Sequence, residues 1–387
     1  MQTSQKQLAD RCLGYALIAF FIPITRLFGI VLKRNHKLKV SPENILFIKI
    51  LGLGSLITAL DSIAAIKKKY PEAKLILLTE TNIADGIRPF KVFDEIWTIE
   101  SSNLFSVFLG SAMHLLKSWK LHNLWVADLE VYSKLTTLFS LFTLAINRFG
   151  FQLFPVYFRK YLNTHNVYFN QFLCLEDNYI NMSEAVTGEN SLGVQGYKIN
   201  SGKRTSESDK TYIALNNTCS DLALVRKMPD ELLQKLCVWI LENTNYKIAL
   251  LGAPIDQMAN ELFINDKLTS EQKIKVINYT GKDGFDAYYN FLSVQTAFII
   301  SIDSAPLHIA KKLGLSTISL WGPTNPKSYL KIYEEEKQRH LYYYSNVQCS
   351  PCVHHTRSLP CGGNNACMKN IEEASITGLI KEMIGNL

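Results

Sequence analysis

Apolar and polar residues follow one another along this chain in short blocks that predict strands and helices in turn. The clearest blocks lie in the last third. An apolar run at Ala297–Ile302 predicts a strand, and Ile309 and Leu313 share one helical face. Gly314 supplies a left-handed helix stop, and Ser316–Trp321 predicts a second strand. This stretch therefore predicts a βαβ unit.

The same alternation runs through the rest of the sequence. Before residue 150 it predicts strands at Ile45–Leu51, Lys74–Leu78, Glu95–Thr98 and Leu124–Asp128, with helices at Leu56–Lys69, 105–118 and Ser133–Leu144. After residue 210 it predicts strands at Thr211–Leu215, Tyr246–Leu251 and Val276–Tyr279, with helices at 284–293 and Ile371–Ile384. Strands that alternate with helices indicate doubly wound parallel sheets, and 387 residues suit two domains better than one core.

The domain organisation that we expect has three parts. Residues 1–40 form an N-terminal apolar and basic segment, 41–200 a first α/β domain and 201–387 a second. The junction is expected near Gly193–Asp209, where the chain is polar and rich in turn residues.

The N-terminal segment contains the most apolar stretch of the protein, residues 12–32. Only Cys12–Thr25, fourteen residues, is free of charge, whereas a membrane span needs roughly 20. Basic residues flank the stretch: Lys6, Arg11, Lys33, Arg34 and Lys37. We expect an interfacial helix on an anionic membrane surface. A helix packed on the protein's own body and a true span remain open.

Polar residues stand directly after the predicted strand at Ala297–Ile302. Asp303 and Ser304 come first, and His308 follows one turn into the helix. Ligands of open α/β sheets bind at the carboxyl ends of the strands, and helix N-termini attract phosphate. We therefore expect an anionic ligand over Ser304–His308. The alternative is that Asp303 and Ser304 only cap the helix.

The motif DSAPLHIAKKLG, followed by SLWGPTNP, resembles the D-[ST]-G-P-x-H-x-A-x-x-L-G … GPT-x-P signature of glycosyltransferase family 9, the ADP-heptose:lipopolysaccharide heptosyltransferases. The resemblance implies a GT-B fold, with two Rossmann-like doubly wound domains facing across a cleft. It assigns a donor-binding role to the residues that match the first motif: Asp303, Ser304, Ala305, Pro306 and His308. Ala305 stands where the family has glycine, and its methyl group would crowd a phosphate.

The implied reaction is inverting, metal-independent transfer of a heptose or similar sugar from a nucleotide-sugar donor such as ADP-heptose. The implied acceptor is lipopolysaccharide or another lipid-linked or polysaccharide glycan. No cofactor is required for this reaction. The implied location is the cytoplasm, peripheral on the inner face of the bacterial cytoplasmic membrane. Two rivals remain open: an epimerase on the same scaffold, and a donor-binding or assembly protein without turnover.

A second match to the family follows the strand at Thr211–Leu215. The run NNTCSDLALVRKMPDELLQKL stands where the family has a phosphate loop and a basic residue. Asn217 and Thr218 fit the loop, and Arg226 or Lys227 fits the cation that would neutralise the leaving diphosphate.

The first domain opens with ILFIKILGLGSLITALDSIAAIKKKYPEAKLILLT, which is similar to the family's opening strand, loop, helix and strand. There a Leu-Gly-Asp triplet supplies the aspartate thought to act as general base, but here the third residue is Ser55. A strand order of 3-2-1-4 would bring Glu130 beside Ser55. We hypothesise that Glu130, together with Asp128, deprotonates the acceptor. The alternative is that both carboxylates only cap a helix or form structural ion pairs.

Four clustered cysteines follow the last core strand: Cys349, Cys352, Cys361 and Cys367. Their spacing, C-x₂-C-x₈-C-x₅-C, permits a structural zinc site, because four thiolates complete a tetrahedral shell. Reduced or paired thiols are the alternative.

Composition adds little that is specific. A net charge of +7 and a pI near 8.8 suit a nucleotide-sugar donor or an anionic membrane surface. No dense Lys/Arg run with interleaved aromatic residues is present, which argues against nucleic acid as a partner.

Overall fold

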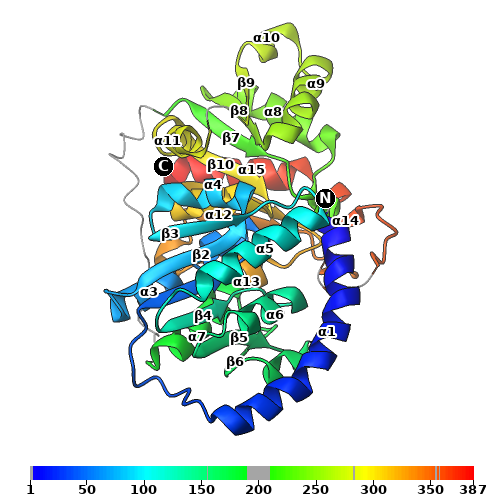
Figure 1. Cartoon of the computed structure of the whole chain (residues 1–387). Coiled ribbons are helices and arrows are strands. Elements are labelled where there is room, and N and C mark those ends of the chain that lie inside the picture. The colour runs from blue at the N-terminus through cyan, green and yellow to red at the C-terminus, as the bar shows by residue number, and fades with distance from the viewer. Residues whose placement is uncertain (1–2, 155, 190–209, 282–283, 354, 357) are drawn as a thin grey trace. The chain divides into compact units, whose positions relative to one another are not determined.

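The computed structural model describes residues 3–154, 156–189, 210–281, 284–353, 355–356 and 358–387. The chain divides into two compact units, Met1–Tyr197 and Lys198–Leu387. Each unit is built on its own parallel sheet (Figure 1). The expected junction at Gly193–Asp209 lies outside the described residues. The N-terminal segment 1–40 belongs to the first unit.

The elements of unit 1 are α1 (Thr3–Leu32), β1 (Asn44–Ile48), α2 (Leu53–Thr58), α3 (Leu60–Lys69), β2 (Lys74–Glu80), α4 (Thr81–Ile87), η1 (Arg88–Phe90), β3 (Glu95–Ile99), α5 (Leu104–Ser118), β4 (Leu124–Asp128), α6 (Lys134–Phe142), β5 (Asn147–Gln152), η2 (Tyr157–Tyr161), β6 (His165–Tyr168) and α7 (Leu175–Thr187). The sheet order is β3-β2-β1-β4-β5-β6. The order reverses between β1 and β4, where Ile48 is paired with Asp128. The carboxyl ends of these two strands therefore form the switch point of the sheet.

The elements of unit 2 are β7 (Tyr212–Asn216), η4 (Asp221–Arg226), α8 (Asp230–Asn243), β8 (Lys247–Gly252), η5 (Pro254–Asp256), α9 (Gln257–Lys267), α10 (Ser270–Lys273), β9 (Val276–Thr280), α11 (Gly284–Gln295), β10 (Thr296–Ile302), α12 (Ala305–Lys312), β11 (Ser316–Trp321), α13 (Pro326–Tyr329), η6 (Glu334–Glu336), β12 (His340–Tyr344), α14 (Ala366–Lys369) and α15 (Glu373–Asn386). The sheet order is β12-β11-β10-β7-β8-β9. Its switch point lies between β7 and β10, where Asn216 is paired with Ser301.

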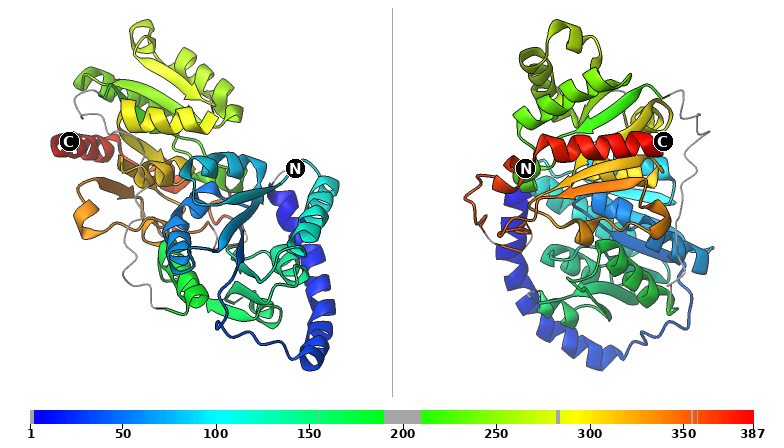
Figure 2. Two further views of the ribbon diagram at one scale, coloured as in Figure 1. Left: turned by 60° about the vertical axis from the view of Figure 1, so that its left-hand side comes forward. Right: turned by 180° about the vertical axis from the view of Figure 1, so that it is seen from behind.

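The core of unit 2 is built around two strands that are buried along their whole length. Every residue of β10 and β11 is buried, as expected for strands in the middle of a parallel sheet. The apolar faces of α8 and α15 pack into one cluster with these strands, and Figure 2 shows α15 lying along the sheet. Gly314 has a φ of 74° and ends the α12 segment, which confirms the predicted left-handed stop.

The helix α1 packs on the body of unit 1 along one face only. Asp10 accepts hydrogen bonds from the backbone N–H groups of Lys134 and Leu135, so it caps α6 from outside that helix. Gly14 lies against the Lys134 side chain, and Ile18 is buried in a cluster with Leu138. The segment Cys12–Leu32 is also long and apolar enough to cross a membrane by length and composition.

The predicted helix Leu56–Lys69 is wrong at its start and in its continuity. Helix α2 begins at Leu53, directly after Gly52, whose φ is 85°. The helical run changes at Ala59, where α3 takes over. The reason is local, because the left-handed glycine turns the chain into a helix within the residues that we expected to form a loop.

Candidate functional site

The switch point of unit 2 is held together by one buried amide. Asn216, the last residue of β7, has an exposed fraction of 0%. Its Nδ2 donates to Ser301 Oγ at 3.0 Å and to Ser304 Oγ at 2.7 Å. These bonds join the carboxyl ends of β7 and β10. They fix the loops after both strands at the edge where ligands of such sheets bind.

Asp303 follows β10 and is flanked by two basic side chains. Its Oδ2 lies 3.4 Å from Arg226 Nη1, and its Oδ1 lies 3.9 Å from His308 Nε2. Burial acts to raise the pKa of Asp303, but His308, Arg226 and Thr324 together hold it below its ordinary value. The carboxylate is therefore charged at neutral pH and orients both basic groups.

Helix α12 begins at this carboxylate with no side-chain cap. Ser304 is the N-cap residue, but its hydroxyl bonds to Asn216 and makes no capping bond to the helix. The N-cap side chain therefore gives the first N–H groups of the helix no hydrogen bond, and the charged side chain at this helix start is Asp303. Ser304 thus occupies the N-cap position, as the capping alternative expects, but its hydroxyl bonds to Asn216 and not to the helix. Ala305 and Pro306 form the first turn.

The other predicted donor residues make contacts within the protein. Asn217 donates to Met228 O at 3.0 Å and accepts from Met228 N at 2.8 Å, which ties the loop to the residues before α8. Thr218 donates to Asn216 Oδ1 at 3.0 Å. Lys227 offers its carbonyl oxygen to Asn365 Nδ2 at 2.8 Å. Among the predicted basic residues, Arg226 is the one whose side chain contacts Asp303, at 3.4 Å.

Two members of this site were missed from the sequence. Asn216 was not singled out, although it is a polar residue that ends an apolar strand, and that position was a usable signal. Thr324 also lowers the pKa of Asp303 and belongs to the SLWGPTNP motif, but nothing in the motif assigns it a partner. Sequence distance explains the omission, since no local pattern joins Thr324 to Asp303.

In unit 1, the Glu130 carboxylate bonds to the residues that directly follow β1. Its Oε1 accepts from the backbone N–H groups of Ile50 and Leu51, both at 2.8 Å. Its Oε2 lies 3.1 Å from Lys49 Nζ, and the two side chains are 11% and 7% exposed. The expected strand order 3-2-1-4 is confirmed. The contacts fit the structural alternative for Glu130, because they fix the turn that leads into α2.

Asp128 is fully buried within unit 1. Its Oδ2 lies 2.6 Å from Arg159 Nη2 and accepts from Thr136 Oγ1 at 2.9 Å. Its Oδ1 accepts from the backbone N–H of Glu130 at 3.0 Å. Both Asp128 and Arg159 have 0% side-chain exposure. A carboxylate that water cannot reach and that is saturated by these donors suits an ion pair of the core.

Ser55 occupies the position where the family has its aspartate. Its hydroxyl donates to Gly52 O at 2.8 Å and is hydrogen-bonded to the Tyr179 side chain. Tyr179 is 1% exposed and lies near Lys49 and Glu130. Ser55 therefore borders a buried cluster of polar side chains, Tyr179, Lys49 and Glu130, which the sequence did not predict.

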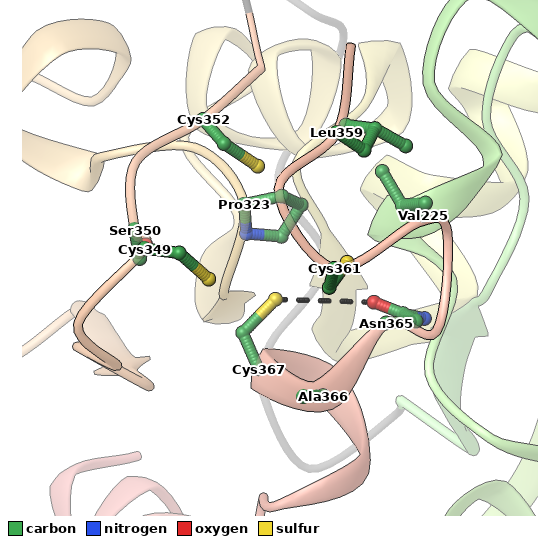
Figure 3. A pocket seen from close by; sticks show the side chains of 10 residues that line it. All are labelled: Val225, Pro323, Cys349, Ser350, Cys352, Leu359, Cys361, Asn365, Ala366 and Cys367. Atoms are coloured by element: carbon green, nitrogen blue, oxygen red, sulfur yellow. Dashed lines mark hydrogen bonds between the residues drawn. The ribbon is translucent and has the colours of Figure 1, made fainter. Parts of the chain in front are cut away.

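The four clustered cysteines are free thiols gathered around one small cavity of unit 2 (Figure 3). In the described part of the chain, no three His, Cys, Asp or Glu side chains are set as the ligands of a metal ion. The arrangement of the thiols therefore does not test the prediction of a structural zinc site.

Part of the chain is similar in sequence to known glycosyltransferases. A model of glycosyltransferase family 9 (heptosyltransferase) matches residues 176–362. Lipooligosaccharide heptosyltransferase 2 of Campylobacter jejuni is 24% identical over 141 residues, which are 36% of this chain and 42% of that protein. The match thus spans less than half of the relative's length.

Solved structures agree over a much longer part of the chain. A glycosyltransferase of family 9 from Veillonella parvula has a TM-score of 0.68 at 14% identity, covering 91% of this chain and 100% of that one. ADP-heptose lps heptosyltransferase II of E. coli has a TM-score of 0.65 at 13% identity, covering 88% and 98%. E. coli heptosyltransferase WaaC with ADP has a TM-score of 0.60 at 12% identity, covering 89% and 98%.

Two six-stranded parallel sheets with helices, and these structural likenesses, define the GT-B fold. The predicted fold class is therefore confirmed. The resemblance to glycosyltransferase family 9, the heptosyltransferases, is confirmed as well, with the family model matched over residues 176–362.

Proposed function

We propose that this protein is a glycosyltransferase that binds a nucleotide sugar at the switch point of unit 2 and transfers the sugar to a glycan acceptor. The observation that carries the proposal is the group of Asp303, Arg226 and His308 at the uncapped start of α12. Such a site offers a guanidinium group, an imidazole and the N–H groups of a helix start, which suit a diphosphate.

The proposed donor is an ADP-linked heptose or a similar sugar. Support comes from the family match and from the heptosyltransferase relatives, one of which is described with ADP. The proposed acceptor is lipopolysaccharide or another lipid-linked glycan.

The proposed chemistry is inverting displacement at the sugar carbon with departure of the nucleoside diphosphate. Negative charge grows on the leaving phosphate as the bond to the sugar breaks. Arg226 and the N–H groups at the start of α12 lie where they would stabilise that charge, and His308 adds a hydrogen-bond donor. Asp303 holds the two basic side chains in place. The transfer therefore needs no metal ion at the donor site.

The acceptor hydroxyl requires a base, and the first unit offers two carboxylates at its switch point. The contacts of Glu130 and Asp128 support roles in positioning the polypeptide. We therefore assign Glu130 to holding the loop before Ser55, and keep its action as the base as the rival hypothesis. Replacing Glu130 by glutamine separates the two roles.

Membrane attachment is also part of the proposal. The face of α1 that does not contact α6 exposes large apolar side chains: Leu13, Leu17, Phe20, Leu27, Phe28 and Ile30. Helix α5 likewise turns Phe105 and Phe108, each 72% exposed, to solvent. Basic residues follow α1 directly. These observations fit an interfacial helix with one face on the protein and the other in the lipid. The proposed location is the inner face of the cytoplasmic membrane.

Vesicle sedimentation tests the attachment. The protein is expected to bind vesicles of phosphatidylglycerol and phosphatidylethanolamine, and Phe20→Glu with Phe28→Glu is expected to abolish binding. Ile255→Glu, at a residue of unit 2 that is 90% exposed, is the matched control. Retention of the wild type in the membrane after carbonate extraction would instead indicate a span.

A thermal-shift screen tests donor binding. ADP-, UDP-, GDP- and dTDP-linked sugars are compared on the wild type, Asp303→Ala and His308→Ala. One donor is expected to raise the unfolding midpoint of the wild type by linkage, and both substitutions are expected to remove the effect. Asp266→Ala, an exposed aspartate of α9, is the control. If no donor stabilises the wild type, the proposed donor site is wrong.

Turnover separates the enzyme from its two rivals. Release of nucleoside diphosphate that depends on an acceptor supports transfer. Isomerisation of the donor without acceptor supports an epimerase. Donor binding without product across an acceptor panel supports a binding or assembly protein.

A further inference from the structure

Helix α5 of unit 1 is apolar on both of its sides. On the side that faces the sheet, Val107 and Leu115 pack against the core of unit 1. The His114 ring stacks on Trp97 with ring centroids 5.2 Å apart, and its Nε2 lies 2.9 Å from Thr98 O. These contacts fix α5 on the sheet.

The side of α5 that faces solvent is apolar as well. Six large side chains on this side and at the helix end are each more than half exposed: Leu104, Phe105, Phe108, Leu109, Leu116 and Trp119. A surface helix of a soluble protein normally carries polar residues on the side that water solvates. A contiguous exposed apolar patch marks a surface that binds a membrane or another protein.

Charge identifies a membrane as the partner of this side of α5. Residues 101–123 contain Lys117 and Lys120 but no Asp or Glu. Residues 11–42, which include most of α1, contain six Lys and Arg residues and again no Asp or Glu. A membrane with anionic headgroups offers such a surface both apolar contact and opposite charge. A second copy of the chain, docked through the same surface, would bring like charges together.

The exposed side of α5 adjoins α1 at the end of α6. Both helices contact α6 (Figure 1). Trp119 Nε1 donates to Phe142 O at 2.8 Å, and the Phe142 ring lies 4.9 Å from that of Phe21 in α1. Arg34, which follows α1, donates from Nη1 to Leu144 O at 3.1 Å. The exposed side of α5 is thus continuous with the surface of α1 and with the basic residues after it.

We propose that α5 is a second membrane-binding helix, and that α1 and α5 together dock unit 1 on an anionic membrane surface. Helix α5 has 15 residues, which span about 22 Å at 1.5 Å per residue, less than the roughly 30 Å of the hydrocarbon core. Its other side is fixed on the sheet. It therefore lies in the plane of the interface, with its exposed apolar side chains at the level of the acyl chains.

The position of α5 in unit 1 links this surface to the edge where ligands bind. The helix begins at Leu104, shortly after β3 ends at Ile99, so its first turns lie at the carboxyl edge of the sheet. The switch point between β1 and β4 opens on the same edge. Two helices fix the tilt of unit 1 on the membrane, whereas one helix leaves it free to rotate. A lipid-linked acceptor would then reach the switch point without leaving the bilayer; only this consequence rests on the proposed function.

Vesicle binding by the full-length protein tests the role of α5. Sedimentation with vesicles of phosphatidylglycerol and phosphatidylethanolamine gives a partition coefficient for the wild type and for Phe105→Glu with Phe108→Glu. Ile255→Glu with Met258→Glu is the matched control, because it has the same spacing on exposed residues of unit 2. We expect the α5 pair to lower the partition coefficient about tenfold or more, and the control pair to change it by less than about twofold. Equal values for the α5 pair and the wild type would overturn the proposal.

A second measurement uses conservative variants, so that a variant that fails to fold does not decide the outcome. Trp119 is 55% exposed, whereas Trp97, Trp125 and Trp321 are buried and Trp239 is half-buried. Vesicles of brominated phosphatidylglycerol quench the fluorescence of a tryptophan that reaches the acyl chains. We expect quenching in the wild type and in Trp239→Phe, and its loss in Trp119→Phe. Quenching that is absent from the wild type, or that persists in Trp119→Phe, would contradict the docking of α5.

The competing partner is a second copy of the chain, and light scattering of the protein without vesicles measures it. A dimer that Phe105→Glu with Phe108→Glu converts to a monomer, together with unchanged vesicle binding, would make α5 a subunit interface and overturn the proposal. A monomeric wild type whose vesicle binding depends on α5 supports it.

None of these measurements uses a nucleotide sugar. A failed donor screen therefore leaves the membrane surface standing, and failed vesicle binding leaves the donor site standing. If both hold, the α5 pair should lower turnover of an acceptor embedded in vesicles about tenfold relative to turnover of its deacylated, water-soluble form.

Discussion

Replacing Glu130 by glutamine gives opposite results for the two roles that its carboxylate can have. The substitution keeps the size of the side chain and leaves an oxygen to accept from the N–H groups of Ile50 and Leu51. It removes the charge that faces Lys49 Nζ at 3.1 Å. Lys49 is then left 7% exposed with no charge of opposite sign from residue 130.

The magnitude follows from the burial of the pair. Removing one partner of a buried ion pair costs about 3–5 kcal/mol, and the remaining exposure of both side chains places this pair near the lower figure. We therefore expect the free energy of unfolding to fall by about 3 kcal/mol at pH 7. Urea denaturation measures the fall. Faster hydrogen exchange in peptides from β1 and β4 would assign this loss of stability to unit 1.

Two further variants make the measurement selective. Glu95→Gln breaks the half-exposed pair between Glu95 and Lys74 and should change the free energy by less than about 1 kcal/mol. Lys49→Met, alone and combined with Glu130→Gln, completes a double-mutant cycle. The double variant should be less destabilised than the sum of the two single changes, because no unpaired charge is left.

The positioning role is refuted by a specific combination of results. A fall of less than about 1 kcal/mol, together with a loss of turnover of about 100-fold or more in the folded protein, would establish Glu130 as the base. A fall near 3 kcal/mol, with turnover per folded molecule reduced by less than about tenfold, supports the positioning role.

Three other predictions test the framework around the sites. The pKa of Asp303 lies below its ordinary value even though burial acts in the opposite direction. Its contribution to stability should thus be present above about pH 4 and vanish as pH falls through the lowered pKa, and Asp303→Asn should flatten that dependence in urea titrations between pH 2 and 7. Asp10→Ala removes the external cap at Lys134 and should cost about 1–2 kcal/mol, seen as faster proteolysis of α1. Asn216→Ala leaves Ser304 Oγ without its 2.7 Å donor, and should lower stability by about 1–3 kcal/mol and weaken the donor-induced thermal shift.

Local sequence patterns predicted the segments whose contacts in space are made with residues nearby in the sequence. The strands Leu124–Asp128 and Ser316–Trp321 are found with the predicted bounds, and β10 begins one residue earlier than predicted. Continuous apolar runs identify central strands of a parallel sheet because both faces are covered. Beyond residue 144 the signal weakened, and β5 and β6 were missed. β6 is an edge strand of four residues and β5 is its inner neighbour, and both carry polar residues such as Asn147 and His165.

The partners of the predicted carboxylates could not be found in the same way. Arg159 lies 31 residues from Asp128, and Asp10 caps a helix that begins more than 120 residues later. Such contacts depend on the three-dimensional packing of elements, and no spacing in the sequence encodes them. The hypothesis for Asp128 therefore rested on its position at the end of a strand. Carboxylates of buried ion pairs and carboxylates of catalytic sites both occur at such positions.

The two units reuse one topology and differ in what occupies the switch point. In unit 1 the carboxylate after the fourth strand, Glu130, turns back onto the chain and bonds the loop that follows β1. In unit 2 the carboxylate at the corresponding place, Asp303, faces Arg226 and His308 in front of a helix start that no side chain caps. The first arrangement satisfies its charges within the protein. The second sets two basic side chains beside a helix start without a side-chain cap, and that difference is why we place the nucleotide in unit 2.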